Sequence, residues 1–153
     1  MTEIEKKENF VFENENQRLL NIFYSNNNWG YDRSGACKKY DLILCGKKVE
    51  EKFRREDYPD IAVEIIQDMR SYSPGWFYET DCDYLFYIFT NAPIKLYSIK
   101  WKEFKLWFLL KYLPRHLIGK YCFSPRGWGD TLNILVPINK VPKELYKYFE
   151  VTP

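Results

Sequence analysis

Two acidic residues and a lysine lie close together in the segment Asp41-Leu-Ile-Leu-Cys-Gly-Lys-Lys-Val-Glu-Glu-Lys-Phe53. Short apolar runs on either side of a glycine predict a β-hairpin, with its turn centred on Gly46-Lys47. That turn would place Asp41 opposite Lys52 in the antiparallel pair. Because strand side chains alternate between the two faces, Asp41, Glu50 and Lys52 would all project from the same face.

Such a group of side chains suits the chemistry of a divalent metal ion. Two neighbouring carboxylates repel each other, and Mg²⁺ relieves that repulsion while it takes oxygen ligands at about 2.0–2.1 Å. A bound metal polarises a phosphoryl oxygen and lowers the pKa of a bound water, and the ammonium of Lys52 can stabilise developing charge. These residues favour phosphodiester hydrolysis. On spacing alone, the alternative is a solvated hairpin face with an ion pair between Asp41 and Lys52.

An aspartate at the start of a strand, a tight hairpin and Glu-x-Lys on the return strand resemble the PD-(D/E)XK, or restriction-endonuclease-like, nuclease superfamily. The segment Gly75-Trp-Phe-Tyr78 followed by Asp83-Tyr-Leu-Phe-Tyr-Ile88 is similar to the next strand of small phage and bacterial members. The proline that usually precedes the aspartate is Tyr40 here. The resemblance covers about residues 10–90.

The resemblance implies a metal site and a catalytic lysine. Asp41, Glu50 and the backbone carbonyl of Glu51 would hold Mg²⁺ or Mn²⁺, and Lys52 would take the catalytic position. Many members add a carboxylate from the first helix, and Glu15 is the candidate for it. The alternative for Glu15 is an exposed acid in a first helical turn, where the helix dipole favours it.

Some members of the superfamily also carry a glutamine and a tyrosine on a helix after the lysine. Gln67 and Tyr72 lie in that region, one residue away from the usual spacing, and Glu64 is a further acid there. We treat Gln67 as an auxiliary candidate. Ordinary structural roles are the alternative for all three.

The overall charge balance leaves room for a local DNA-binding surface. The chain carries 23 basic and 21 acidic residues, a net charge of +2, which excludes a polybasic, histone-like protein. Basic residues nevertheless gather around the hairpin, and such a face can contact phosphates. The candidates are Lys38, Lys39, Lys48, Arg54 and Arg55. The alternative is a solvated surface.

The remaining pattern predicts an α/β fold, a central mixed sheet flanked by helices with a restriction-endonuclease-like core. We expect one domain over residues 1–153, with the core at about 10–90 and an extension at 94–150. Apolar periodicity and breaker residues define the elements. Helices are predicted at 9–28 (capped by Asn14 or Asn16), 60–69, 101–113 and 143–149, and strands at 84–89, 94–99 and 131–138.

Several other classes are disfavoured. No apolar run is long enough to span a membrane, and the charged amino terminus lacks a signal-peptide core, so a cytoplasmic location in a bacterial cell or a phage-infected host is expected. Nucleotide-binding glycine motifs are missing. Neither the sole histidine, His116, nor the four cysteines show zinc-ligand spacing, and the cysteines are expected to be reduced thiols.

Taken together, the sequence predicts a metal-dependent nuclease that cleaves DNA with water as the nucleophile. At this size it would act as a homodimer, with a partner protein, or on a distinctive DNA structure. The alternative is a catalytically silent nuclease-like fold that binds nucleic acid or protein.

Overall fold

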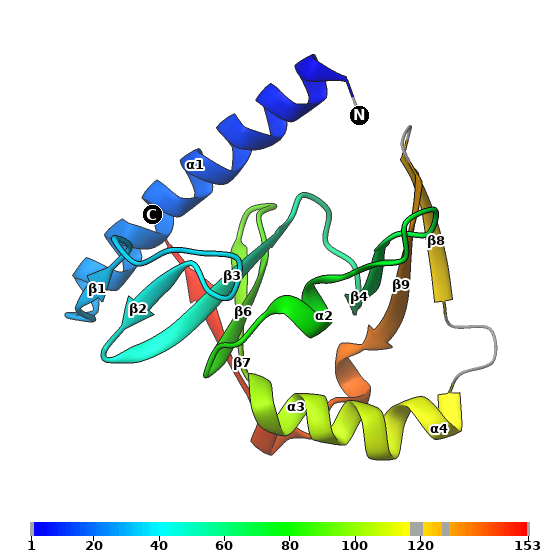
Figure 1. Ribbon diagram of the computed structural model, residues 1–153. Coiled ribbons are helices and arrows are strands. Elements are labelled where there is room, and N and C mark those ends of the chain that lie inside the picture. Colours follow the sequence, from blue (N-terminus) through cyan, green and yellow to red (C-terminus); the bar gives the residue numbers. More distant parts are fainter. Residues whose placement is uncertain (1, 117–120, 127–128, 153) are drawn as a thin grey trace.

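Two β-sheets form the framework of the protein (Figure 1). The computed structural model describes residues 2–116, 121–126 and 129–152. The first sheet has six strands in the order β1-β2-β3-β6-β7-β10: β1 (Tyr31–Asp32), β2 (Leu42–Leu44), β3 (Lys47–Arg54), β6 (Tyr84–Phe89), β7 (Ile94–Lys100) and β10 (Tyr146–Val151). The second has four in the order β5-β4-β9-β8: β5 (Ser73–Pro74), β4 (Asp60–Asp68), β9 (Gly129–Pro137) and β8 (Tyr121–Arg126).

The first sheet is mixed, and this confirms the α/β class. β3 and β6 pair in parallel, whereas the other neighbours in the sheet are antiparallel. The strands predicted at 84–89, 94–99 and 131–138 are confirmed as β6, β7 and β9. The run Tyr84–Phe89 is buried almost throughout, which explains why it is continuously apolar and aromatic.

Helix α1 (Glu3–Asn26) covers part of one face of the first sheet. Its carboxyl-terminal half buries Leu20, Phe23 and Tyr24 against that face, whereas its amino-terminal half extends beyond the strands (Figure 1). The helix predicted at 9–28 is confirmed but begins earlier. Thr2, rather than Asn14 or Asn16, caps it, through a reciprocal capping box with Glu5.

The main apolar core lies between the other face of the first sheet, the second sheet and a helical segment. That segment consists of α3 (Trp101–Trp107), the π-helical turn η1 (Phe108–Tyr112) and α4 (Leu113–His116). Its buried residues Trp101, Phe104, Phe108 and Tyr112 recur every three or four positions and so share one face. The helix predicted at 101–113 is therefore confirmed, although it continues to His116 rather than ending at Pro114.

The helix predicted at 60–69 is wrong, because this segment is strand β4. Ile61 and Val63 are buried and lie two positions apart, as in a strand with one face in the core. β4 pairs with β9, which is more than 60 residues away in the sequence. The four-residue spacing of Ile61 and Ile65 fits the period of a helix and that of a strand. The pairing with β9 decides for the strand.

The helix predicted at 143–149 is also wrong. Pro142 precedes only a 3₁₀ turn, Lys143–Leu145, and the chain then becomes strand β10 (Tyr146–Val151), antiparallel to β7. Tyrosine, phenylalanine and valine favour extended structure, and the open edge of β7 supplies the pairing partner.

Three further sequence features are the possible membrane spans, the cysteines and the histidine. In the described residues no helix is long and apolar enough to cross a membrane. Cys37, Cys45 and Cys82 are free thiols. The side chains of Cys122 and His116 lie outside the described residues.

Candidate functional site

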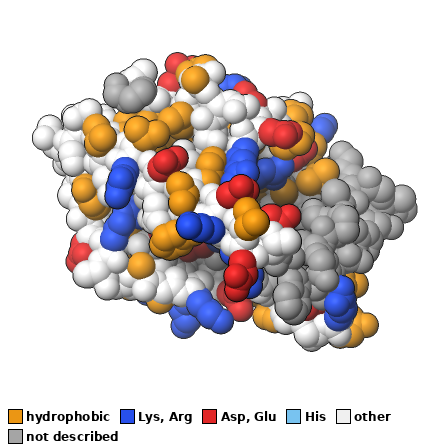
Figure 2. Space-filling view, turned by 90° about the horizontal axis from the view of Figure 1, so that it is seen from above, with side chains coloured by type: hydrophobic (Ala, Val, Ile, Leu, Met, Phe, Trp, Pro, Cys, Tyr) orange, Lys and Arg blue, Asp and Glu red, His pale blue; other side chains and the backbone are white. Residues whose placement is uncertain are grey.

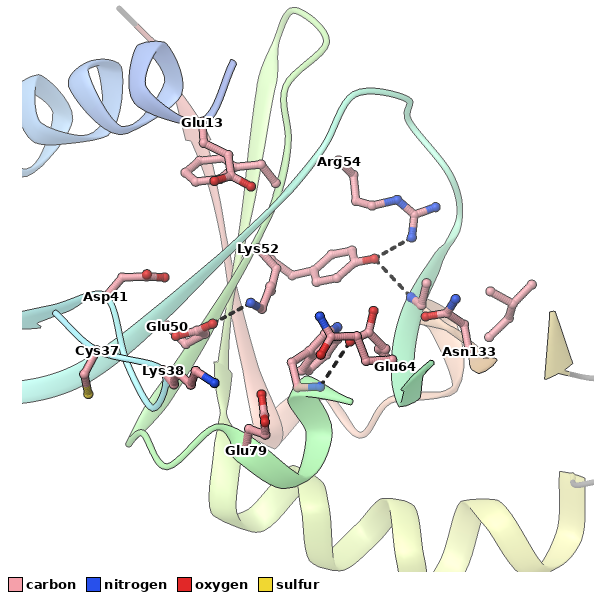
Figure 3. Close-up of a pocket in the computed structure, with 16 residues that line it drawn as sticks. Glu13, Cys37, Lys38, Asp41, Glu50, Lys52, Arg54, Glu64, Glu79 and Asn133 are labelled. Atoms are coloured by element: carbon pink, nitrogen blue, oxygen red, sulfur yellow. Dashed lines mark hydrogen bonds and ion pairs between the residues drawn. The ribbon is translucent and has the colours of Figure 1, made fainter. Parts of the chain in front are cut away.

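A cleft of about 800 Å³ opens between β3 of the first sheet and β4 and β9 of the second (Figure 3). α1, α2 (Trp76–Glu79) and the loop before β2 complete its walls. Charged side chains dominate the lining. The acidic ones are Glu13, Asp41, Glu50, Glu64 and Glu79, and the basic ones are Lys38, Lys52 and Arg54.

The hairpin brings the three predicted site residues into this cleft. The turn lies at Cys45-Gly46, where both residues have positive φ, rather than at Gly46-Lys47. Leu42 therefore pairs with Val49, and continuing this register places Asp41 opposite Glu50 instead of Lys52. A register shift of two residues leaves every side chain on its expected face, so the predicted grouping survives the corrected pairing.

Glu50 is the most unusual group in the cleft. Its side chain is 6% exposed, one carboxylate oxygen lies 2.5 Å from Lys52 Nζ, and Oε2 has no hydrogen-bond partner among the described residues. Burial raises the pKa of Glu50 to about 7, although Lys52 acts in the opposite direction. An unpartnered buried carboxylate oxygen is costly and suits a cation that binds there.

Lys52 points into the cleft between Glu50 and an aromatic ring. Its ammonium lies 5.7 Å from the centre of the Trp76 ring, in a cation–π arrangement. Burial opposes protonation, but the Glu50 carboxylate outweighs it and raises the pKa of Lys52 above its ordinary value. Lys52 is therefore an ammonium ion at neutral pH.

Asp41 and Glu51 are linked through the backbone. β2 begins only at Leu42, and the Asp41 carboxylate accepts a 2.7 Å hydrogen bond from the Glu51 N–H. The Glu51 side chain points to the opposite face of the sheet, where its carboxylate accepts hydrogen bonds from Tyr24 and, through two nitrogens, from Arg33. Arg33 also donates to Asn21 of α1.

This network gives the Glu51 side chain a structural role that the sequence did not reveal. The sequence interpretation assigned a role only to the Glu51 carbonyl. The Glu51 carboxylate is fully buried, and burial raises its pKa while Arg33 acts in the opposite direction. An arginine eighteen residues away gives no local sequence signal for such a pair.

The first helix places Glu13, rather than Glu15, at the cleft. Glu13 projects from α1 toward the other carboxylates (Figure 3). Glu15 is exposed and lines a shallow groove on the outer side of α1. The helical period explains the difference, because Glu13, Asn16 and Leu20 share the inward side of α1, whereas Glu15 lies beside Val11 and Ile22.

Of the candidates after Lys52, two lie in the cleft and one does not. Gln67 and Glu64 of β4 both line the cleft, and the Glu64 carboxylate accepts a 3.3 Å hydrogen bond from the backbone N–H of Trp76. Tyr72 is 75% exposed in the turn after β4 and has a positive φ of 54°. Tyr72 is thus not part of the cleft.

Of the five basic candidates, two line the cleft. Lys38 lies near its entrance, and Arg54 donates to the Tyr87 hydroxyl in its wall (Figure 3). The exposed Lys39, Lys48 and Arg55 lie outside it. Lys48 stands over the ring of Tyr40, and Arg55 contacts Asn9 and Phe12 of α1.

The charge of the cleft limits what it can bind. Five acidic and three basic lining residues give a formal charge of −2, so an anionic substrate would need a cation beside it. Asp41 and Glu50 are the residues that fit such a cation. In the described part of the chain, no three His, Cys, Asp or Glu side chains approach closely enough to form a complete metal cluster.

Comparison of the chain with protein-family models, curated proteins and solved structures found no match. The geometry of the cleft is therefore the basis for assigning a function.

Proposed function

We propose that this protein is a nuclease that hydrolyses DNA phosphodiester bonds with the help of Mg²⁺ or Mn²⁺. The observation that carries the proposal is the unpartnered, buried oxygen of Glu50, which lies on the same strand face as Asp41 and Lys52. An oxygen ligand, a second carboxylate and a fixed ammonium are the groups that phosphoryl chemistry needs.

Each residue has a distinct role in this proposal. Asp41, Glu50 and the carbonyl of Glu51 would hold the metal, which when bound would polarise the phosphate and lower the pKa of water. Hydrolysis adds water oxygen to phosphorus, with the water's proton released to bulk water, and breaks the bond to the leaving sugar oxygen, which takes up a proton from bulk water. Lys52, protonated at neutral pH, would stabilise the added negative charge rather than accept a proton.

The chain topology supports a restriction-endonuclease-like core. A helix precedes the β2–β3 hairpin, and a crossover leads from β3 to the parallel strand β6. The crossover differs from the expected form, because it contains β4, β5 and the four-residue helix α2 in place of one long helix. In this crossover, β4 and α2 form the second wall of the cleft.

The test is cleavage of supercoiled plasmid, linear duplex, single-stranded and branched DNA, with Mg²⁺, Mn²⁺ or EDTA. The Lys52→Ala protein should lose at least about 100-fold in rate, as expected when a charge-stabilising group is removed. The Asp41→Asn protein should also lose activity, because a proposed metal ligand is removed. The matched control is Lys111→Ala, which changes an exposed lysine that does not line the cleft. This variant should cleave DNA at the wild-type rate. Cleavage that persists in EDTA or in both site variants would contradict the proposal.

A second candidate function is binding without cleavage. It is favoured by the spacing of the acidic side chains, since no three of them among the described residues lie close enough together to hold a metal ion. A protein that binds DNA but neither cleaves it nor binds Mn²⁺ would support this candidate. Mn²⁺ binding measured by thermal shift separates the two, because it must disappear in Asp41→Asn if the site holds the metal.

A further inference from the structure

A second groove lies on the opposite face of the first sheet from the cleft. Its volume is about 610 Å³, and residues of β2, β3, β6, β7 and β10 line it. Its floor is apolar and aromatic, with Val49 of β3, Tyr84 and Phe86 of β6 and Phe149 of β10. Trp29, which follows α1, forms one end.

Lysines surround this apolar floor. Lys47, Lys100, Lys143 and Lys147 line the groove together with one acid, Glu144, so the local formal charge is +3. None of these lysines takes part in the ion pairs found among the described residues. The groove therefore suits an occupant that is both apolar and acidic.

The amino-terminal half of α1 has these properties. Ile4, Phe10 and Val11 are 71%, 67% and 46% exposed. Residues 3–15 of this helix, without the cleft residue Glu13, carry four glutamates and two lysines and thus a formal charge of −2: Glu3, Glu5, Glu8, Glu15, Lys6 and Lys7. The face seen from above shows apolar side chains exposed among charged ones (Figure 2).

We propose that two copies of this chain form a two-fold dimer in which the amino-terminal half of each α1 occupies the lysine-lined groove of the other copy. α1 has 24 residues and is therefore about 36 Å long. Its carboxyl end lies beside the groove of its own copy, where Trp29 lines the floor. Two antiparallel α1 helices would place each amino-terminal half next to the groove of the other copy, and the symmetry forms every contact twice.

The groove and the cleft are separate sites, although Glu13 in the docking half of α1 lines the cleft. On β3, Val49 faces the groove whereas Glu50 and Lys52 face the cleft, so the two sites lie on opposite faces of one sheet. The proposal does not depend on nuclease activity. Its failure would leave the proposed function untouched.

The test is the mass in solution, measured by light scattering at low salt and high protein concentration. The wild-type protein should have twice the monomer mass of 18.6 kDa. The variants Lys100→Glu/Lys147→Glu and Glu8→Lys/Glu15→Lys should each be monomeric, because each places like charges at the interface. Glu8 and Glu15 are exposed positions on α1, and Lys100 and Lys147 are exposed positions in the groove. Circular dichroism verifies that both variants fold.

Mixing the two variants is the decisive experiment. In the mixed pair, one groove is acidic and meets a basic helix, whereas the other retains the wild-type pairing, so the dimer mass should return. Lys111→Glu/Lys140→Glu, two exposed lysines outside the groove, is the matched control and should stay dimeric. A monomeric wild type, a dimer that both variants retain, or a mixture that stays monomeric would each overturn the proposal. Binding of nucleic acid or an acidic peptide by a monomer would assign the groove to another partner.

Discussion

The Asp41 carboxylate takes the place of a missing strand residue, because it accepts the 2.7 Å hydrogen bond from the Glu51 N–H just where the β2–β3 pairing ends. One hydrogen bond thus pairs β3 beyond the start of β2 and fixes a proposed metal ligand. Asp41 thus has an observed structural role and a proposed metal-binding role, and its two carboxylate oxygens allow both.

Variants of Asp41 should separate these roles. Asp41→Asn keeps an oxygen that can accept the hydrogen bond, so we expect little loss of stability but loss of Mn²⁺ binding. Asp41→Ala leaves the N–H of a buried residue unsatisfied and should cost about 1–3 kcal/mol in the free energy of unfolding. Urea denaturation and Mn²⁺ titration measure the two effects. Equal stability of the two variants would contradict this division.

The pair formed by Arg33 and Glu51 should contribute strongly to stability. Arg33→Met leaves a fully buried carboxylate with only Tyr24 as a partner, and loss of one member of a buried ion pair costs about 3–5 kcal/mol. Because the carboxylate must then be buried without its cation, the loss should grow as the pH rises. Urea denaturation at several pH values measures it.

Two further variants test the interpretation of this pair. Arg33→Met/Glu51→Leu removes both charges and should recover most of the lost stability. Arg55→Met removes an exposed arginine that contacts Asn9, and it should change stability by less than about 1 kcal/mol. A double variant as unstable as the single one would show that the charge of Glu51 is not the cause.

Local sequence spacing was sufficient to predict the grouping of Asp41, Glu50 and Lys52. A tight hairpin leaves few registers, and any shift by two residues keeps the same side chains on one face. The exact pairing depended on which residues adopt positive φ, and Cys45 gave no indication that it would do so. The α/β class could also be predicted locally, because strongly apolar segments such as Tyr84–Phe89 indicate buried strands.

Distant contacts decided the features that the sequence did not reveal. The segment 60–68 is a strand because β9 pairs with it, and Tyr146–Val151 is a strand because β7 does. The choice of Glu13 over Glu15 depends on how α1 is rotated against the sheet, and Leu20, Phe23 and Tyr24 set that rotation from the far end of the helix. None of these partners is close in the sequence.

Gly75 should be required for the second wall of the cleft. A Cβ atom at this position would lie 2.4 Å from the backbone oxygen of Glu64, so α2 could not stay against β4. Gly75→Ala should therefore cost about 1–3 kcal/mol, as overpacking generally does. Gly30→Ala is the matched control, because its Cβ would meet open space. Thermal unfolding compares the two, and equal melting temperatures would show that the backbone adjusts without cost.

The pH dependence of stability should depend on Glu50. Its pKa is about 7 in the folded protein against an ordinary 4.5, so the folded state binds this proton more tightly than the unfolded chain does. The associated stability is complete below pH 4.5 and is lost as the pH rises through about 7, a total of about 3 kcal/mol at 1.36 kcal/mol per pKa unit. Glu50→Gln cannot ionise, so the difference between wild type and variant should grow over this interval in favour of the variant.

Metal binding gives that pH dependence a second, opposite readout. A cation needs the ionised form of Glu50, so Mn²⁺ should bind the wild-type protein more tightly as the pH rises through about 7. At pH 8, Mn²⁺ should therefore restore the stability that ionisation of Glu50 removes, and it should have no such effect on Glu50→Gln. Melting temperatures measured with and without Mn²⁺ at pH 5 and pH 8 provide the comparison. An Mn²⁺ shift that is equal at both pH values, or that persists in Glu50→Gln, would place the cation away from Glu50 and remove the main support for hydrolysis in this cleft.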